Sequence, residues 1–183
     1  VIHAVPFFSQ RSRHEWKLRG FRNPTEAMQW ESRVCGIACL RAAFDLHGRR
    51  VGQSFAGLIK EMRARQVYVD GIGCYHEPIA EVLREDGIDA EKLKGQTIHD
   101  LVAHINDGNA LIVSTAHRLQ GGAQAGHLSI LVGYMAEGER ITSLIMHHGS
   151  HLREWELPEW EVERTRFETH FGGRAIRFAA RRG

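Results

Sequence analysis

The chain is poor in cysteine and lacks any long apolar run, and each shortage excludes a class of protein. Three cysteines in 183 residues are a small and odd number, so a disulfide-stapled scaffold is not expected. Cys35 and Cys39 lie one helical turn apart, where their Cβ atoms are roughly 6 Å apart and too distant for an easy disulfide. No apolar stretch of about 18 residues is present, so no membrane span is predicted.

Charge of either sign is also not in excess. The chain has 24 lysines and arginines against 22 acidic residues, which leaves a net charge of +2. Such a balance does not favour nucleic acid or an anionic membrane surface as a partner. Free thiols and a first segment without a secretory signal favour a reducing compartment, and we expect a cytoplasmic protein.

The length and the ordinary content of apolar residues predict one domain over residues 1–183. Helical periodicity dominates the first part of the chain, with capping residues and glycines at the ends of the periodic segments. The expected helices cover residues 24–29, 35–47, 54–65, 75–86 and 98–107. They make up a helical half of about residues 1–108.

After residue 108 the pattern changes to short apolar runs that are typical of buried strands. We expect strands at 110–115, 128–135, 141–148 and 175–179, a further strand at 151–157, and a helical or mixed segment at 158–167. Helices followed by antiparallel strands predict an α+β fold, with N-terminal helices packed on a C-terminal sheet of about residues 109–183.

Cys35 is the first candidate for chemistry. It lies at the predicted start of a helix, where the positive end of the helix dipole favours the thiolate. Gly36 beside it leaves room for the backbone of a substrate. The alternative is a structural role, since a free cysteine is often a small apolar residue buried under a helix.

His127 is the second candidate. Gly126 and His127 open an apolar strand that ends in Gly133 and Tyr134. A thiol nucleophile needs a base, and an imidazole facing the cysteine helix would supply one. The alternative is that His127 is one polar residue among 12 histidines, placed at the end of a strand.

Two motifs in this order resemble one family. The first is Cys-Gly-x-Ala-Cys-Leu, from Cys35 to Leu40, and the second is Gly-His followed by an apolar strand and Gly-Tyr. The chain is similar to the papain-like cysteine peptidases related to the leader-cleaving, double-glycine peptidase domains of bacteriocin exporters. The N-terminal Val5–Gln10 and the C-terminal Phe171–Ile176 extend the resemblance over nearly the whole chain. It implies a papain-like fold, a peptide or protein substrate, and a thioester formed through a Cys35–His127 thiolate–imidazolium pair.

The resemblance also implies a glutamine that donates a hydrogen bond to the oxyanion of the reaction. Gln10 follows the Val-Pro-aromatic run that carries this glutamine in the family. Gln29 lies at the spacing before the cysteine that papain-like enzymes commonly use. We favour Gln10 because its local motif matches, and Gln29 stays as the alternative. Residues 11–30 and the loop 119–126, which ends in Gly126, are expected to border the substrate cleft.

The third catalytic position departs from the family, which has an aspartate or asparagine there. Alignment outward from His127 places His148 at this position. A neutral histidine can accept a hydrogen bond from another imidazole, but it carries no charge to stabilise an imidazolium. His127 is therefore expected to be a weaker base, unless a neighbour such as His147 contributes. Two functions follow: an active peptidase or transpeptidase with impaired activity, or a peptide-binding module that has lost catalysis.

A third function is suggested by a segment rich in histidine. His147, His148 and His151 are close in sequence, and zinc binds imidazole and thiolate ligands. Alternation along a strand sends His147 and His148 to opposite faces, however, which argues against a shared metal. We therefore predict neither a metal site nor a cofactor, and a metal-binding protein remains the least favoured alternative.

Overall fold

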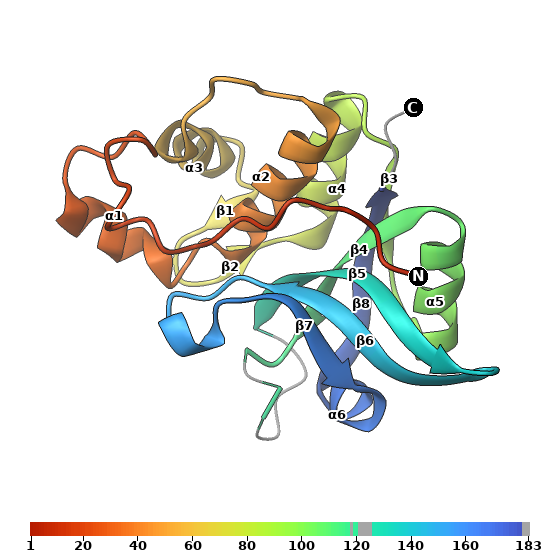
Figure 1. Cartoon of the computed structure of the whole chain (residues 1–183). Helices are drawn as coiled ribbons and strands as arrows, with labels where there is room; N and C mark the ends of the chain where they lie inside the picture. The colour runs from red at the N-terminus through yellow and green to blue at the C-terminus, as the bar shows by residue number, and fades with distance from the viewer. Residues whose placement is uncertain (118, 121–125, 181–183) are drawn as a thin grey trace.

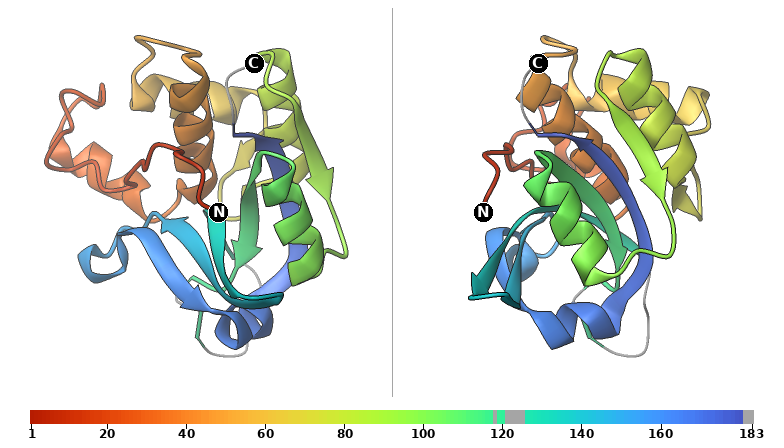
Figure 2. Two further views of the ribbon diagram at one scale, coloured as in Figure 1. Left: turned by 45° about the vertical axis from the view of Figure 1, so that its right-hand side comes forward. Right: turned by 90° about the vertical axis from the view of Figure 1, so that its right-hand side faces the viewer.

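The fold is an antiparallel sheet with helices on both faces (Figures 1 and 2). The computed structural model describes residues 1–117, 119–120 and 126–180. Across the sheet, these residues form six strands in the order β3 (Ala90–Leu93), β8 (Phe171–Ala179), β4 (Asn109–Thr115), β5 (His127–Glu137), β6 (Arg140–His148) and β7 (Leu157–Glu163). Every neighbouring pair is antiparallel. The α+β prediction is confirmed.

The first five helices begin and end close to the residues that the capping pattern predicts. They are α1 (Pro24–Glu31), α2 (Cys35–His47), α3 (Phe55–Ala64), α4 (His76–Glu85) and α5 (Ile98–Asn106). A sixth helix, α6 (Arg164–His170), starts near the end of the segment that was expected to be helical or mixed. The Asn23 side chain accepts a hydrogen bond from the Glu26 N–H at the start of α1, and Gly48 ends α2 with a left-handed φ of 61°. Within the described part of the chain, no helix has the length and apolar character needed to cross a membrane.

Two hydrophobic cores lie on the two faces of the sheet. Ile130 and Val132 of β5 face the core that contains α2, α3 and α4, whereas Leu131 faces the core that contains α5 and α6. Because both faces are covered, β5 is apolar at successive positions instead of alternating with polar residues. Figure 2 shows α5 and the helices α2 and α4 on opposite sides of the sheet.

Two segments differ from the sequence-based expectations, and a third agrees with its mixed prediction. β3 was not predicted; with four residues, one of them buried, it is too short for a clear period. The strand expected at 151–157 is wrong, because this segment contains the 3₁₀ turn η1 (Arg153–Trp155), and β7 starts only at its last residue. The segment 158–167 is mixed, with most of β7 followed by the start of α6. After α3, residues 68–74 form a small hairpin of β1 (Tyr68–Val69) and β2 (Gly73–Cys74).

The N-terminal segment crosses the sheet and reaches the start of α2 (Figure 1). The His3 N–H donates to the Val132 carbonyl at 2.8 Å, and the Val5 carbonyl lies 2.7 Å from Nε2 of His147. Gly133 permits this crossing, because a Cβ there would lie 2.4 Å from the Val1 carbonyl oxygen. The glycine of the Gly-Tyr motif therefore has a structural reason: it lets the first residues lie directly on β5.

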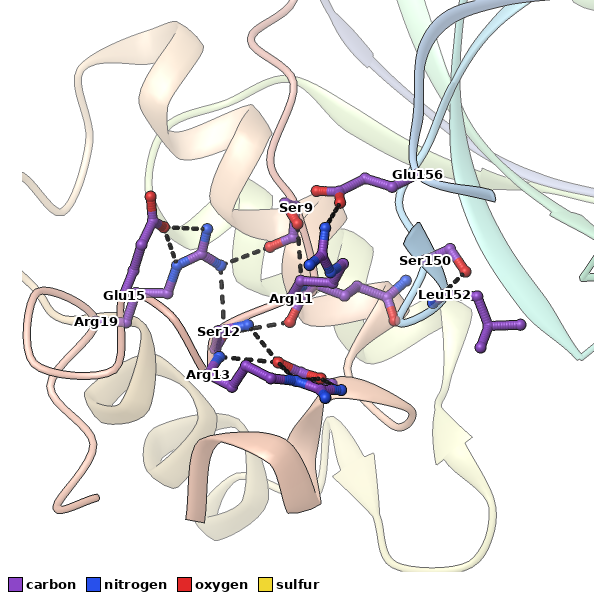
Figure 3. A network of polar contacts seen from close by, with 11 residues as sticks. Ser9, Arg11, Ser12, Arg13, Glu15, Arg19, Ser150, Leu152 and Glu156 are labelled. Carbon is purple, nitrogen blue, oxygen red and sulfur yellow. Dashed lines mark hydrogen bonds and ion pairs between the residues drawn. The ribbon is translucent and has the colours of Figure 1, made fainter. Parts of the chain in front are cut away.

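Glu31, at the end of α1, fixes the next part of this segment. Its carboxylate accepts hydrogen bonds from the backbone N–H groups of Ser12 and Arg13, each at 2.8 Å, and pairs with the Arg13 guanidinium at 2.6 Å. Figure 3 shows the polar contacts around Ser12 and Arg13. Burial by itself would raise the pKa of Glu31, but these hydrogen bonds outweigh burial and lower the pKa below its ordinary 4.5. The charged carboxylate therefore stabilises the fold.

We expect Glu31→Gln to lower the free energy of unfolding at pH 7 by about 2 kcal/mol, because buried N–H donors lose a charged acceptor. The folded-state pKa is depressed, so the contribution is present above pH 4.5 and is lost as the pH falls through the folded pKa. Urea unfolding of both proteins across this range measures the difference.

Glu15→Gln is the matched control, because Glu15 pairs with Arg19 in the same segment but has a side chain that is 55% exposed. Its effect should stay within about 0.5 kcal/mol. A Glu31→Gln variant as stable as wild type at pH 7, or a difference that does not shrink in acid, would contradict the assignment.

Candidate active site

Cys35 is the first residue of α2, and its sulfur lies against the start of β5. The Leu128 N–H is hydrogen-bonded to the Cys35 thiol. Val34, the residue that caps the helix, makes no side-chain cap hydrogen bond. The N–H groups of the first turn are thus left for another acceptor at the cysteine. The structure brings the thiol next to the residue that follows His127 in the chain.

Gly36 allows this close approach between helix and strand. A Cβ at this position would lie 2.7 Å from the Cys74 side chain and 3.0 Å from Cδ1 of Leu128. Any larger residue would therefore push α2 away from β2 and β5. Gly36 is buried, so its small size has a structural reason in addition to the predicted substrate contact.

All three thiols are free, and they differ in their surroundings. Cys35 is half-buried as a whole residue, and burial raises the pKa of its thiol above 9.0, although hydrogen bonds from the Leu128 and Gly36 backbone lower it in part. Burial also raises the pKa of Cys74, and it raises that of Cys39 well above the usual value. Cys35 is therefore protonated at neutral pH in this structure.

Gln10 lies beside Cys35, and Gln29 does not. Gln10 is 2% exposed, lines the same small pocket as Cys35, and donates from Nε2 to the Gly149 carbonyl at 2.8 Å. Gln29 is exposed on α1. An amide nitrogen has two N–H groups, so the hydrogen bond to Gly149 leaves one for a further acceptor in the pocket.

His127 is buried at the start of β5 and is surrounded by other imidazoles. Burial lowers its pKa well below 6.5, and the neighbouring His148 and His117 lower it further, while a hydrogen bond with the Gly149 backbone acts in the opposite direction. Nε2 of His127 has no hydrogen-bond partner among the described residues. His127 is therefore neutral at pH 7.

His148 lies next to His127, with 4.6 Å between the ring centroids. Its Nδ1 lies 3.0 Å from Oγ of Ser129, its Nε2 has no partner within the described ranges, and the Trp160 ring contacts it edge-on at 5.4 Å. Burial, and then the charge of His117, lower its pKa to about 3. His148 thus stands beside the proposed base as an uncharged ring.

His147 faces the other side of the sheet, as strand alternation predicts. Both of its ring nitrogens are occupied by the backbone: Nε2 lies 2.7 Å from the Val5 carbonyl, and Nδ1 accepts from the Glu159 N–H at 3.1 Å. The structure therefore gives His147 the task of tying the N-terminal segment to β6. The suggestion that His147 assists His127 is wrong, because its nitrogens are already used.

His117 belongs to the site although no sequence motif pointed to it. It follows the end of β4, and the pairing of Thr115 with His127 brings the two histidines to the same end of the sheet. Their ring centroids are 4.6 Å apart, and Nε2 of His117 lies 3.0 Å from Oγ of Ser150. Antiparallel pairing of the strands expected at 110–115 and 128–135 would have placed His117 near His127, but only if the register of the pairing had been known.

A second pocket, whose lining does not include Gln10, also contains Cys35. Glycines and the side chains of two loops line it: Ser32, Arg33, Tyr68, Gly71, Ile72, Gly73 and Gly126. Gly126 is exposed and has a φ of 112°, and no atom of the described residues lies within 4 Å of an added Cβ. The rest of the loop expected to border the cleft, residues 121–125, lies outside the described residues.

The comparisons with known proteins identify the family and the fold of the chain. A family model described as the Peptidase_C39 like family matches residues 2–152. The chain belongs to this family, and the resemblance found in the sequence is confirmed. Among curated protein sequences, none matches the chain.

Solved structures show the same fold at low sequence identity. A structure described as a C39-like peptidase from Bacillus anthracis is 16% identical, with a TM-score of 0.60 over 100% of this chain and 98% of that one. The peptidase domain of Streptococcus ComA, an ABC transporter, is 17% identical with a TM-score of 0.56, over 80% and 91% of the two chains. A double glycine motif protease from an AMS/PCAT transporter, in complex with its leader peptide, is 12% identical with a TM-score of 0.51, over 79% and 84%.

The state of the Cys35 thiol can be tested by alkylation. Since only the thiolate reacts, a pKa above 9.0 predicts that iodoacetamide labels Cys35 slowly at pH 7 and about tenfold faster for each unit of pH up to pH 9. Cys35 should still be modified before Cys39 and Cys74. Peptide mapping by mass spectrometry measures all three rates.

Cys35→Ala serves as the control, because it removes the thiol that is expected to react first of the three. A Cys35 rate that is high and constant from pH 6 to pH 8 would instead indicate a thiolate–imidazolium pair in the resting protein.

Proposed function

We propose that this chain is a cysteine peptidase that cleaves a peptide bond through Cys35. The observation that carries the proposal is the position of Cys35 at the start of α2, hydrogen-bonded to Leu128 beside the proposed base, with Gln10 in the same pocket. Membership of the family and the glycine-lined second pocket support a peptide as substrate. The complex of a related fold with its own leader peptide supports the same substrate class.

His127 acts as the base and later as the acid. Its low pKa and the raised pKa of Cys35 favour a thiol and a neutral imidazole before substrate binds. As Sγ of Cys35 attacks the peptide carbonyl carbon, His127 takes the thiol proton, and the C–N bond then breaks as His127 gives that proton to the leaving amine. The acyl group remains as a thioester, which water hydrolyses or a second amine resolves in transpeptidation.

The oxyanion of the tetrahedral intermediate is stabilised by two donors. Gln10 contributes the amide N–H that Gly149 does not use, and α2 contributes the backbone N–H of Cys35 at its uncapped start. Donors held in place before the reaction act strongly, because they need no reorganisation as the charge develops. Gly126, with Gly36 beside the nucleophile, completes the proposed contacts with substrate backbone.

A peptide-binding module without catalysis is the second candidate. It is favoured by one specific observation: the groups that shift the pKa of His127 are imidazoles and the Gly149 backbone, with no carboxylate among them. An imidazolium formed at His127 would lack a counter-charge, which slows proton transfer to it.

The first test compares the two glutamines. We expect Cys35→Ala to abolish cleavage of peptides from a digest library, and Gln10→Ala to lower kcat on the best substrate about 100-fold because one oxyanion donor is lost. Gln29→Ala should stay within about twofold of wild type, since this side chain is exposed on α1. Cleavage that survives in Cys35→Ala, or equal losses in both glutamine variants, would contradict the assignment.

The second test supplies the missing charge. We expect His148→Asp to raise kcat at neutral pH about tenfold or more, because a carboxylate beside His127 stabilises its protonated form. His148→Ala is the control, since it removes the same ring without adding a charge, and it should give no gain. If His148→Asp folds, binds peptide and shows no more cleavage than His148→Ala, the binding-module function gains support.

A further inference from the structure

Three imidazole rings converge where β4, β5 and β6 end. We call His117, His127 and His148 the histidine cluster. One ring nitrogen from each lies within 4.8 Å of the other two, and adjacent ring centroids are 4.6 Å apart for both pairs that include His127. In a tetrahedral zinc site with metal–nitrogen bonds of about 2.0–2.1 Å, ligand nitrogens are about 3.3 Å apart. Small side-chain rotations would close the remaining gap.

Two buried nitrogens of the cluster are unsatisfied within the described part of the chain. Nε2 of His127 and Nε2 of His148 have no hydrogen-bond partner among the described residues, although the two residues are only 6% and 0% exposed. A buried polar atom without a partner destabilises the fold, because it has lost its hydrogen bonds to water. A metal ion between the two rings would satisfy both atoms at once.

Each ring is also held from its other side. Ser129 Oγ lies 3.0 Å from Nδ1 of His148, and Ser150 Oγ lies 3.0 Å from Nε2 of His117. The Gly149 backbone makes the corresponding hydrogen bond with His127. Histidines that bind metals usually have such partners, which fix the orientation of the ring.

The chemistry of the rings suits a metal, because imidazole nitrogens are common ligands of transition metals. On the outer side, the His151 ring stacks on His117 at 5.5 Å and 11°. The set of ligands is all nitrogen, which zinc and the neighbouring divalent transition metals prefer over calcium or magnesium.

We propose that the histidine cluster binds one divalent transition-metal ion of the zinc class, with the fourth position taken by water or a substrate atom. The ligands are not the histidines that the sequence suggested, because His147 faces away and His117 replaces it. Metal binding itself does not depend on the proposed peptidase activity. The expected inhibition does rest on the proposed activity, because a metal on His127 occupies the nitrogen needed for proton transfer and so prevents cleavage.

The test titrates chelator-treated full-length protein with Co²⁺, followed by visible absorption, and then with Zn²⁺ in competition. We expect one ion per chain and an affinity that falls about 100-fold or more in His117→Ala and in His148→Ala, because each loses a ligand. His99→Ala, an exposed histidine on α5, and Cys35→Ala should keep wild-type affinity within about twofold.

Folding of the variants is controlled by circular dichroism and by the thermal midpoint. Zinc should raise the midpoint of wild type and of both controls, but not of the cluster variants, since a ligand stabilises only a fold that binds it. Ser129→Ala keeps all three rings and should weaken binding about tenfold through the lost orientation of His148. It provides a test if His148→Ala does not fold.

Several results would overturn the proposal: no saturable binding by wild type, equal affinity in His117→Ala, or loss of binding in Cys35→Ala, which would indicate a thiolate ligand. Cleavage assays with and without zinc then separate the two proposals. If the protein binds zinc but cleaves no peptide in the metal-free state, the metal-site proposal stands and the peptidase proposal fails. If it cleaves peptide but binds no zinc, the peptidase proposal stands and the metal-site proposal fails.

Discussion

The contact between the start of α2 and the start of β5 determines the arrangement of the whole site. The Leu128 N–H reaches the Cys35 thiol only because Gly36 lets the helix lie against β2 and β5 without a side chain between them. This contact joins the helical core to the sheet at Leu128, the residue that follows the proposed base His127 in the chain. Stability and chemistry therefore depend on the same close approach, and a larger residue at 36 would disturb both.

The N-terminal segment depends on that contact and completes the site. It crosses β5 over Gly133, is tied to β6 through His147 and is fixed to α1 through Glu31. These attachments lie on either side of Gln10 and hold its amide in the pocket of Cys35. A residue far from the cysteine in sequence thus becomes a neighbour in space, because the buried hydrogen bonds of its own segment allow one course across the sheet.

The surroundings of His127 set this chain apart from a peptidase with a carboxylate at the third position. A carboxylate stabilises an imidazolium, whereas the rings of His117 and His148 disfavour a second positive charge. The same neutral rings are good ligands for a metal. We expect the histidine at position 148 to weaken general-base catalysis and to favour metal binding for one reason, namely that an imidazole is a neutral donor of electron pairs.

The sequence by itself determined the family, the α+β order and the helix boundaries, because caps such as Asn23 and Gly48 and the apolar periods act over a few residues. It named Cys35, His127, His148 and both glutamines, and it favoured Gln10 over Gln29 only on a local motif. Only the tertiary structure placed Gln10 beside the thiol and left Gln29 exposed, occupied both nitrogens of His147, and brought His117 to His127. Those outcomes depend on strand register and on chain crossings between distant segments, and local sequence patterns carry no information on either.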